Sequence, residues 1–244
     1  MKSPVLRELP LWAATATLAP LLLVQGRRAR DATPRLPEAE GARAGCAGQG
    51  RPLRLLILGD SAAAGVGVTS QEEALSGCLQ RELMPRHRLQ WRLLARTGAG
   101  VADARVMLRG ARGIVCDAAL VSLGANDATA LRGTRGFVSE YAGLVAQLRD
   151  DCGARCVLAS GLPPMHGFPA LPQPLRRIIG AHARRLDRAL SHWCAGQPGL
   201  EHLPFGELPA REWMASDGFH PGARVYAHWA RRAAARIAAR LASD

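Results

Sequence analysis

The chain has 244 residues, of which 48% are hydrophobic and 21% charged. This composition is typical of a globular protein, and the length suffices for one α/β domain with a full core and an extension. The net charge is +12, but the basic residues are almost all arginines spread along the chain, and only 5% of the residues are aromatic. Because basic and aromatic residues are not interleaved in any segment, the composition argues against nucleic-acid binding.

The N-terminal segment, residues 1–26, contains an apolar run from Leu9 to Val24, interrupted by Pro10 and Pro20 and flanked by basic residues. The run is shorter than the about 20 residues of a spanning helix. A signal peptide, an uncleaved anchor and an interfacial segment held by arginines all fit this pattern. We therefore expect membrane association through this segment, with a cytoplasmic or an exported soluble form as the alternatives.

The next segment, residues 27–52, is rich in Arg, Pro, Gly, Ala and Glu and is predicted to be a linker. Residues 53–244 then alternate short apolar runs with helical patterns, which is typical of a parallel α/β sheet. Strands are predicted at 53–58, 89–94, 118–123, 156–160 and 200–203, and helices at 71–84, 101–112, 134–149, 175–193 and 222–241. This layout predicts a three-layer α/β/α sandwich with a flavodoxin-like parallel sheet of about five strands.

A serine follows the first predicted strand, in Gly59-Asp60-Ser61, and the residues after it are small. In open parallel sheets the ligand crevice lies outside the carboxyl ends of the strands. We therefore expect the Ser61 hydroxyl to lie uncovered at that edge, where it can act as a nucleophile. The surrounding glycines have neither the spacing of a phosphate-binding loop nor that of a G-x-S-x-G elbow.

Three further blocks lie at predicted strand ends or in loops. They are Arg96-Thr97-Gly98-Ala99-Gly100-Val101-Ala102-Asp103, Leu123-Gly124-Ala125-Asn126-Asp127 and Ser216-Asp217-Gly218-Phe219-His220-Pro221. Together with the Gly-Asp-Ser block, and in this order, they resemble the SGNH (GDSL-type) hydrolase family of esterases and lipases, over roughly residues 53–240. The resemblance implies the same α/β/α architecture and a serine hydrolase that cleaves carboxylic esters through an acyl-enzyme.

A serine hydroxyl is a weak nucleophile at neutral pH, so it needs a base and a group that orients the base. An imidazole has an ordinary pKa of about 6.5 and can accept a proton at pH 7 and return it. His220 is therefore the candidate base for Ser61, and Asp217 is the candidate orienting carboxylate. Gly218 can take the positive φ of a tight turn between them. Alternatively, Asp217 caps the last helix and His220 lies on the surface.

The resemblance also implies an oxyanion hole formed by the backbone N–H of Ser61, the backbone N–H of Gly98 and the side-chain amide of Asn126. Independently of the resemblance, Asn126 follows a buried strand at the same sheet edge as Ser61, and its amide donates hydrogen bonds without adding charge. Two alternatives stay open: Asn126 closes the strand as an Asx-turn, and Gly100 takes the place of Gly98.

A proline-rich stretch follows the fourth predicted strand, between residues 163 and 174. It predicts a stiff loop at the catalytic edge, with Met165 and Phe168 in the acyl pocket or, alternatively, a purely structural crossover. The expected substrate is a small-molecule or lipid ester. Carbohydrate O-acetylesterase or acyltransferase activity and a catalytically silent binding module are the alternatives.

The cysteines and the remaining histidines carry no recognisable site. Six cysteines without a Cys-x-x-Cys pair are predicted to be buried free thiols, with a disulfide as the alternative in an oxidising compartment. Because no spacing is typical of a zinc site, no metal and no cofactor are expected. The other histidines are predicted to be surface or packing residues without partners, and the sequence leaves the oligomeric state open.

Overall fold

The computed structural model describes residues 4–111, 113–207 and 210–242. Strands and helices alternate from residue 51 onward, as the sequence predicts. The elements in chain order are α1 (Pro4–Thr17), α2 (Ala19–Ala32), β1 (Ala44–Ala47), β2 (Arg51–Gly59), α3 (Leu75–Leu83), β3 (His87–Ala95), α4 (Val101–Gly110), β4 (Ala118–Ser122), α5 (Ala125–Thr129), α6 (Thr134–Asp150), β5 (Cys156–Ser160), η1 (Met165–Gly167), α7 (Leu175–Cys194), β6 (Leu200–Leu203), η2 (Arg211–Trp213) and α8 (Ala223–Ala242).

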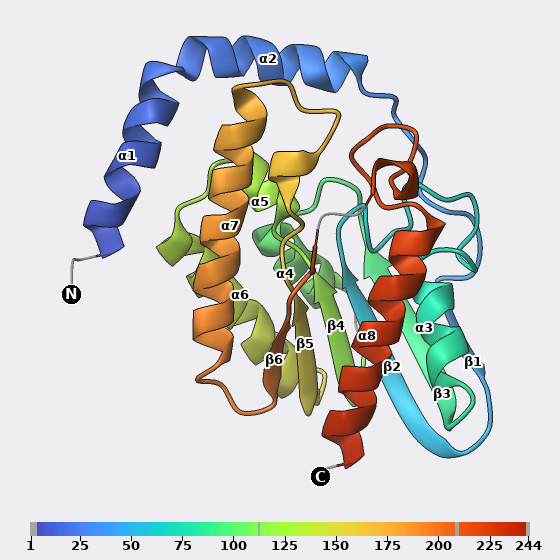
Figure 1. The fold of residues 1–244 in the computed structure, drawn as a ribbon. Coiled ribbons are helices and arrows are strands. Elements are labelled where there is room, and N and C mark those ends of the chain that lie inside the picture. The colour runs from blue at the N-terminus through green and yellow to red at the C-terminus, as the bar shows by residue number, and fades with distance from the viewer. Residues whose placement is uncertain (1–3, 112, 208–209, 243–244) are drawn as a thin grey trace.

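One mixed sheet forms the centre of the molecule, with strand order β1-β3-β2-β4-β5-β6 (Figure 1). The strands from β3 to β6 are parallel to their neighbours, whereas β1 pairs antiparallel with β3. Counted without β1, the order is that of a flavodoxin-like sheet, whose ligand crevice lies where the chain reverses direction beside the first parallel strand. The predicted fold class is confirmed, with β1 as an additional edge strand.

Helices cover both faces of this sheet because successive strand residues point to opposite sides. Leu56 and Leu58 on β2 belong to a core shared with α4, α6 and α7. Leu55 and Ile57, one position away, belong to a second core shared with α3 and α8. All four side chains are at most 2% exposed, so β2 is the buried centre of a three-layer sandwich (Figure 1).

Residues 27–52 are not the uniform linker that the sequence predicts. Helix α2 continues to Ala32, β1 occupies Ala44–Ala47, and β2 begins at Arg51. The short run of alanine, glycine and cysteine in β1 has neither alternating hydrophobicity nor β-branched residues, which are the signals of a strand in a sequence. It becomes a strand because its backbone pairs with the exposed edge of β3, with Ala44 opposite Arg92.

Helix α3 begins at Leu75, whereas the periodicity of the sequence predicts a start at residue 71. The reason is Gln71, whose side chain is 4% exposed. Its Nε2 donates hydrogen bonds to the carbonyl oxygens of Ala39 at 3.1 Å and Ala64 at 2.9 Å. These bonds hold the residues before Leu75 in a turn that ties the incoming chain to the loop after β2.

The apolar run from Leu9 to Val24 is divided between α1 and α2, which meet at Leu18. Leu22 is 8% exposed and belongs to the core that contains α7. Trp12 packs edge-on against His182 of α7, with ring centroids 5.1 Å apart. Within the described residues, no helix combines the length and the apolar character needed to cross a bilayer.

Candidate active site

Ser61 lies in a turn fixed by the end of β2. Gly59 is aligned with Ala95 of β3 and with Ser122 of β4, so the carboxyl ends of these three strands meet at one edge. A Cβ atom on Gly59 would lie 2.5 Å from the carbonyl oxygen of Ser122, so only glycine fits there. Asp60 then donates its N–H to the same oxygen at 3.2 Å. The sequence Gly-Asp-Ser therefore folds tightly over β4 and leaves Ser61 at the sheet edge.

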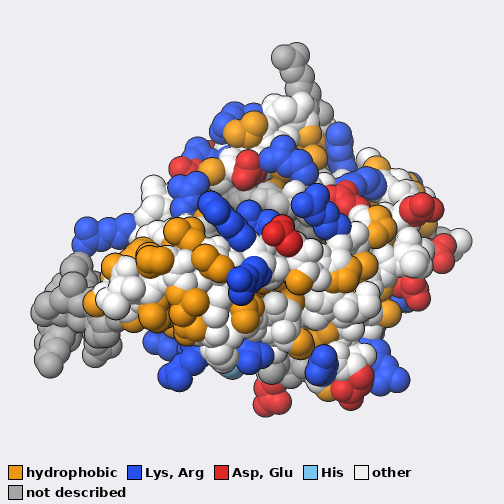
Figure 2. Space-filling view, turned by 90° about the horizontal axis from the view of Figure 1, so that it is seen from above, with side chains coloured by type: hydrophobic (Ala, Val, Ile, Leu, Met, Phe, Trp, Pro, Cys, Tyr) orange, Lys and Arg blue, Asp and Glu red, His pale blue; other side chains and the backbone are white. Residues whose placement is uncertain are grey.

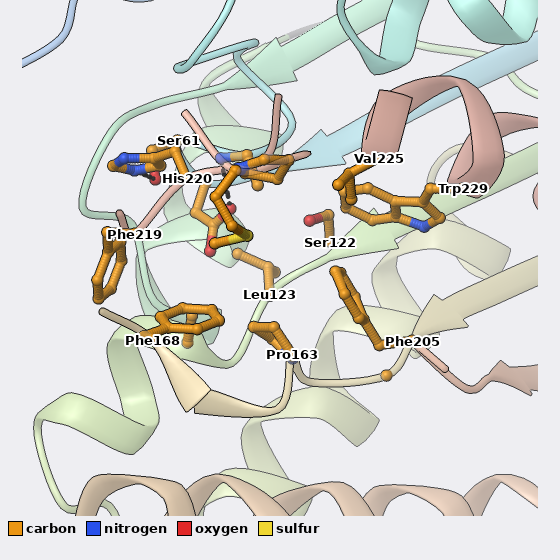
Figure 3. Close-up of a pocket in the computed structure, with 16 residues that line it drawn as sticks. Ser61, Ser122, Leu123, Pro163, Phe168, Phe205, Phe219, His220, Val225 and Trp229 are labelled. Carbon is orange, nitrogen blue, oxygen red and sulfur yellow. Dashed lines mark hydrogen bonds between the residues drawn. The ribbon is translucent and has the colours of Figure 1, made fainter. Parts of the chain in front are cut away.

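Ser61, His220 and Asp217 form a hydrogen-bonded relay, of which Figure 3 draws Ser61 and His220. The Ser61 Oγ atom lies 2.9 Å from His220 Nε2, and His220 Nδ1 lies 2.5 Å from Asp217 Oδ2. The second carboxylate oxygen, Oδ1, accepts the backbone N–H groups of Phe219 at 2.9 Å and His220 at 3.0 Å. The structure thus joins residues 159 positions apart, and the alternative in which His220 is an isolated surface residue is wrong.

The charge on Asp217 determines which nitrogen of the His220 ring faces it with a proton. Burial acts to raise the pKa of Asp217, but the hydrogen bonds from the His220 ring and from two backbone N–H groups outweigh it, and the net pKa is lowered. The carboxylate is therefore ionised and can only accept, so His220 Nδ1 carries a proton. In a neutral His220 ring, Nε2 is then the nitrogen with the free lone pair, and it faces the Ser61 hydroxyl at 2.9 Å.

The turn that carries Asp217 and His220 depends on Gly218, which has a φ of +63°. Its N–H donates to Ala215 O at 3.0 Å, and its carbonyl accepts the N–H of Ala170 at 3.3 Å. The positive φ is the conformation that the sequence predicts for this glycine. The contact with Ala170 fixes the turn to the proline-rich loop after β5.

Two backbone N–H groups, in the loops after the aligned strands β2 and β3, are candidates for binding an oxyanion. Among the described residues, the N–H groups of Ser61 and Gly98 have no protein acceptor. Gly98 is exposed and has a φ of +83°. The N–H of Gly100, in contrast, donates to the Asp103 carboxylate at 3.0 Å as part of the α4 cap. The geometry therefore favours Gly98 over Gly100.

Asn126 links the loops that follow β2 and β3. Its Nδ2 donates to Ala99 O at 3.0 Å and makes a longer contact of 3.5 Å to Asp60 Oδ2. Asp60 is 4% exposed, and burial raises its pKa to about 6 against the lowering effect of hydrogen bonds and of His220. Its other oxygen accepts the N–H of Ala62 at 3.1 Å, so Asp60 orders the turn around Ser61.

An apolar cavity of about 50 Å³ opens beside Ser61 (Figure 3). Phe168 and Phe219 form one wall, with ring centroids 5.2 Å apart, and Phe205 and Trp229 form another, 5.8 Å apart. The position of Phe168 agrees with the pocket that the sequence predicts. The walls are mainly apolar, and the polar side chains that line the cavity are Asp60, Ser61, Ser122 and His220.

Met165 does not line this cavity, and the prediction for it is wrong. Its side chain is 0% exposed and belongs to the core between the sheet and α7. Residues Met165–Gly167 form a short 3-10 helix that packs closely on α7, where a Cβ atom on Gly180 would lie 2.5 Å from the Cβ atom of His166. This close packing turns Met165 inward, whereas Phe168, just beyond the 3-10 helix, turns toward the cavity.

Several site residues carried no usable signal in the sequence. Phe205 comes from the loop after β6, and Trp229 from α8, for which the sequence predicts a helix but no part in the cavity. The pairing of His202 Nε2 with Asp187 Oδ1 at 2.9 Å also corrects the expectation that the other histidines have no partners. Asp187 lies on α7 and His202 on β6, so only the packing of that helix on the sheet reveals the pair.

The cysteines are separate from this site. All six are free, and all but Cys46 are buried. Burial raises the pKa of Cys116 and Cys194 to about 12, so these thiols are unreactive. Throughout 4–111, 113–207 and 210–242, no group of three His, Cys, Asp or Glu side chains is placed to hold a metal ion.

Residues 57–228 match the family described as GDSL-like Lipase/Acylhydrolase. The chain belongs to this family. It is also 33% identical over 190 residues to a protein of Mycobacterium tuberculosis named as a GDSL-like esterase, with 72% of this chain covered. The chain spans 58% of the length of that relative.

Solved structures share the fold of this GDSL-family chain at low sequence identity. The native aryl esterase of M. smegmatis has a TM-score of 0.60 and 17% identity, over 77% of this chain and 99% of that one. A carbohydrate acetylesterase family member from Sinorhizobium meliloti has a TM-score of 0.59 and 17% identity, over 78% and 99%. A lipolytic G-D-S-L protein from Veillonella parvula has a TM-score of 0.57 and 13% identity, over 74% and 95%.

Proposed function

We propose that this GDSL-family chain is a serine hydrolase that cleaves carboxylic esters through an acyl-enzyme. The observation that carries the proposal is the relay of Ser61, His220 and Asp217 at the mouth of an apolar cavity. Membership of the family supports the same reaction class, and so does the esterase name of the mycobacterial relative.

In the first half of the reaction, Ser61 Oγ attacks the ester carbonyl carbon while His220 Nε2 takes the hydroxyl proton. The imidazolium formed is stabilised by the Asp217 carboxylate through Nδ1. Collapse of the tetrahedral intermediate breaks the bond to the alcohol oxygen, and His220 Nε2 returns the proton to that oxygen. The acyl group is left on Ser61, and the alcohol departs.

In the second half, water attacks the acyl-enzyme and His220 again takes and returns the proton, which releases the acid. Both halves place negative charge on the carbonyl oxygen. The N–H groups of Ser61 and Gly98 supply two donors, and removing one donor of this kind costs about 2.7–4 kcal/mol of transition-state stabilisation. The Asn126 amide supplies the third, because one of its N–H groups has only the long contact to Asp60.

A fluorophosphonate probe tests the nucleophile. We expect the wild-type chain to be labelled and the Ser61→Ala variant to remain unlabelled, because the probe reacts with an activated serine hydroxyl. Ser122→Ala is the matched control, since Ser122 lines the same cavity without belonging to the relay, and its label should persist. Equal labelling of wild type and Ser61→Ala contradicts Ser61 as the nucleophile, whereas no labelling of a folded wild type supports a catalytically silent binding module.

The size of the cavity favours a second candidate, the removal of small acyl groups such as acetyl from a carbohydrate. A volume of about 50 Å³ holds roughly three to five water-sized positions. A panel of esters from acetyl to palmitoyl, followed by acetylated sugars, separates the candidates. If kcat/KM is highest for short-chain esters whatever their alcohol, the result supports a general esterase. If kcat/KM is much higher for acetylated sugars than for other acetyl esters, the result supports the second candidate.

Transfer of the acyl group to an alcohol is the remaining alternative on the same site. The acyl-enzyme reacts with whichever nucleophile reaches it beside His220. Product analysis in the presence of an added alcohol distinguishes the two outcomes, because hydrolysis yields only the free acid whereas transfer yields a new ester.

A further inference from the structure

Helix α2 presents an apolar outer surface that the fold does not cover. Leu21 is 45% exposed, Leu23 64% and Val24 46%. Exposed leucine and valine side chains on three of four successive positions are unfavourable in water unless another surface covers them. The helix is 14 residues long, which corresponds to about 21 Å.

The same outer surface becomes basic in the second half of the helix. Arg27, Arg28 and Arg30 are exposed, and none of them forms an ion pair within the described part of the chain. The acidic residue of the helix is Asp31. Figure 2 looks down on this end of the molecule and shows hydrophobic side chains gathered together with Lys and Arg side chains beside them.

The inner surface of α2 is fixed to the domain. Leu22 is buried in the core, and Gln25 makes one hydrogen bond to the loop before α7 and one to the first residue of α7. Its Nε2 donates to Gln173 O at 2.7 Å, and its Oε1 accepts the N–H of Leu175 at 3.1 Å. The exposed residues are therefore held in place on a docked helix.

The position of α2 relates this surface to the catalytic edge. The helix lies across the end of the molecule toward which the parallel strands run (Figure 1). The loop that Gln25 holds is the loop that carries Phe168 into the cavity. A flat partner that covers α2 would therefore lie at the same end of the molecule as the mouth of the site.

We propose that α2 is an interfacial helix that docks the molecule on an anionic lipid surface. Leucine and valine side chains enter the boundary between headgroups and acyl chains, while arginine guanidinium groups bind lipid phosphates. Each arginine near an anionic surface contributes about 1 kcal/mol to binding. The apolar and basic residues share one outer face of α2, as binding to a lipid surface requires. The inference does not depend on the proposed hydrolysis, because this face lies outside the cavity.

Vesicle co-sedimentation of the full chain tests this inference independently of catalysis. We expect wild type to bind vesicles of phosphatidylcholine mixed with phosphatidylglycerol and to bind pure phosphatidylcholine weakly. The triple variant R27E/R28E/R30E should lose at least about tenfold in partition coefficient, and L21S/L23S/V24S should lose a similar factor. All changed residues are exposed, so thermal midpoints close to that of wild type will show that the variants are folded.

The control R51E/R86E/R88E makes the same change in net charge at the opposite end of the sheet, where β2 and β3 begin, and it should bind within twofold of wild type. An equal loss in this control overturns the proposal, because binding would then follow net charge alone. Equal binding of wild type to both vesicle types also overturns it. A wild-type dimer that L21S/L23S/V24S converts to a monomer, without vesicle binding by either, assigns the surface to a second copy of the chain.

Discussion

In the proposed mechanism Asp217 acts through the His220 ring, because its carboxylate lies 2.5 Å from Nδ1. In Asp217→Asn the amide can donate to Nδ1, which favours the tautomer with the proton on Nε2, so the ring can no longer accept from Ser61. The corresponding change in a serine protease lowers kcat about 10⁴-fold. We expect a fall in kcat of that order for this chain, with a much smaller change in KM, in steady-state hydrolysis of a soluble ester. A loss confined to KM would contradict the orienting role of Asp217.

Asp60 gives the stability of the fold a pH dependence. Burial raises its pKa from 3.8 to about 6, so between these values the folded chain binds more protons than the unfolded chain. Stability therefore decreases as pH rises from about 4, and the decrease ends about one pH unit above the folded-state pKa. The shift corresponds to about 3 kcal/mol. Asp60→Asn keeps an acceptor for the Ala62 N–H but cannot titrate. The free energy of unfolding of this variant, measured in urea, should therefore lack the decrease between pH 4 and 7. Identical pH profiles for the variant and wild type would contradict the assignment to Asp60.

At the scale of elements, α7 holds two site loops through one carboxylate. Asp187 Oδ1 accepts the N–H of Leu162, at 2.9 Å, and lies 2.9 Å from His202 Nε2. Leu162 lies between Gly161 and Pro163, which line the cavity, and His202 precedes the loop of Phe205. The helix thus fixes the backbone behind the aromatic wall.

Removing this carboxylate should loosen the cavity as well as the fold. Asp187→Ala leaves the Leu162 N–H and the His202 ring, whose side chain is 8% exposed, without a partner, which costs about 1–3 kcal/mol. We expect a lower urea midpoint and reduced discrimination between short and longer acyl esters. Arg188→Ala, an exposed position on the same helix, is the control and should change neither quantity. A variant with unchanged stability would show that the pair does not fix these loops.

At the scale of the whole molecule, α1 and α2 lie outside the sheet, so their removal should lower the thermal stability without unfolding the chain. Leu22 is the buried apolar residue that α2 contributes to the core, and burial of such a side chain is worth about 1.5–3 kcal/mol. A chain that starts at residue 33 keeps β1 and the whole sheet. Its Tm should be lower by roughly 3–12 °C, and it should keep fluorophosphonate labelling of Ser61. Loss of all structure in circular dichroism would contradict the independence of residues 33–244.

The relay could be predicted because each of its parts has a local signature. Ser61 follows an apolar run and a glycine, and Asp217 and His220 are separated by a glycine turn that brings them together. Such signals depend on a few neighbouring residues, and parallel strands automatically bring their carboxyl ends to one edge. The inward position of Met165 could not be predicted, because it depends on how closely the 3-10 helix packs on α7.

The sequence by itself therefore determined the main strands and helices and the residues that follow the strands, since hydrophobic periodicity and turn residues act over short distances along the chain. The flavodoxin-like strand order was expected from the alternation of these elements and from the family resemblance. Only the tertiary structure decided the pairing of β1, the aromatic walls of the cavity, the contact between Asp187 and His202, and the docking of α2. These features are contacts between residues far apart in sequence, and they depend on the shapes of the packed surfaces, for which no local pattern exists.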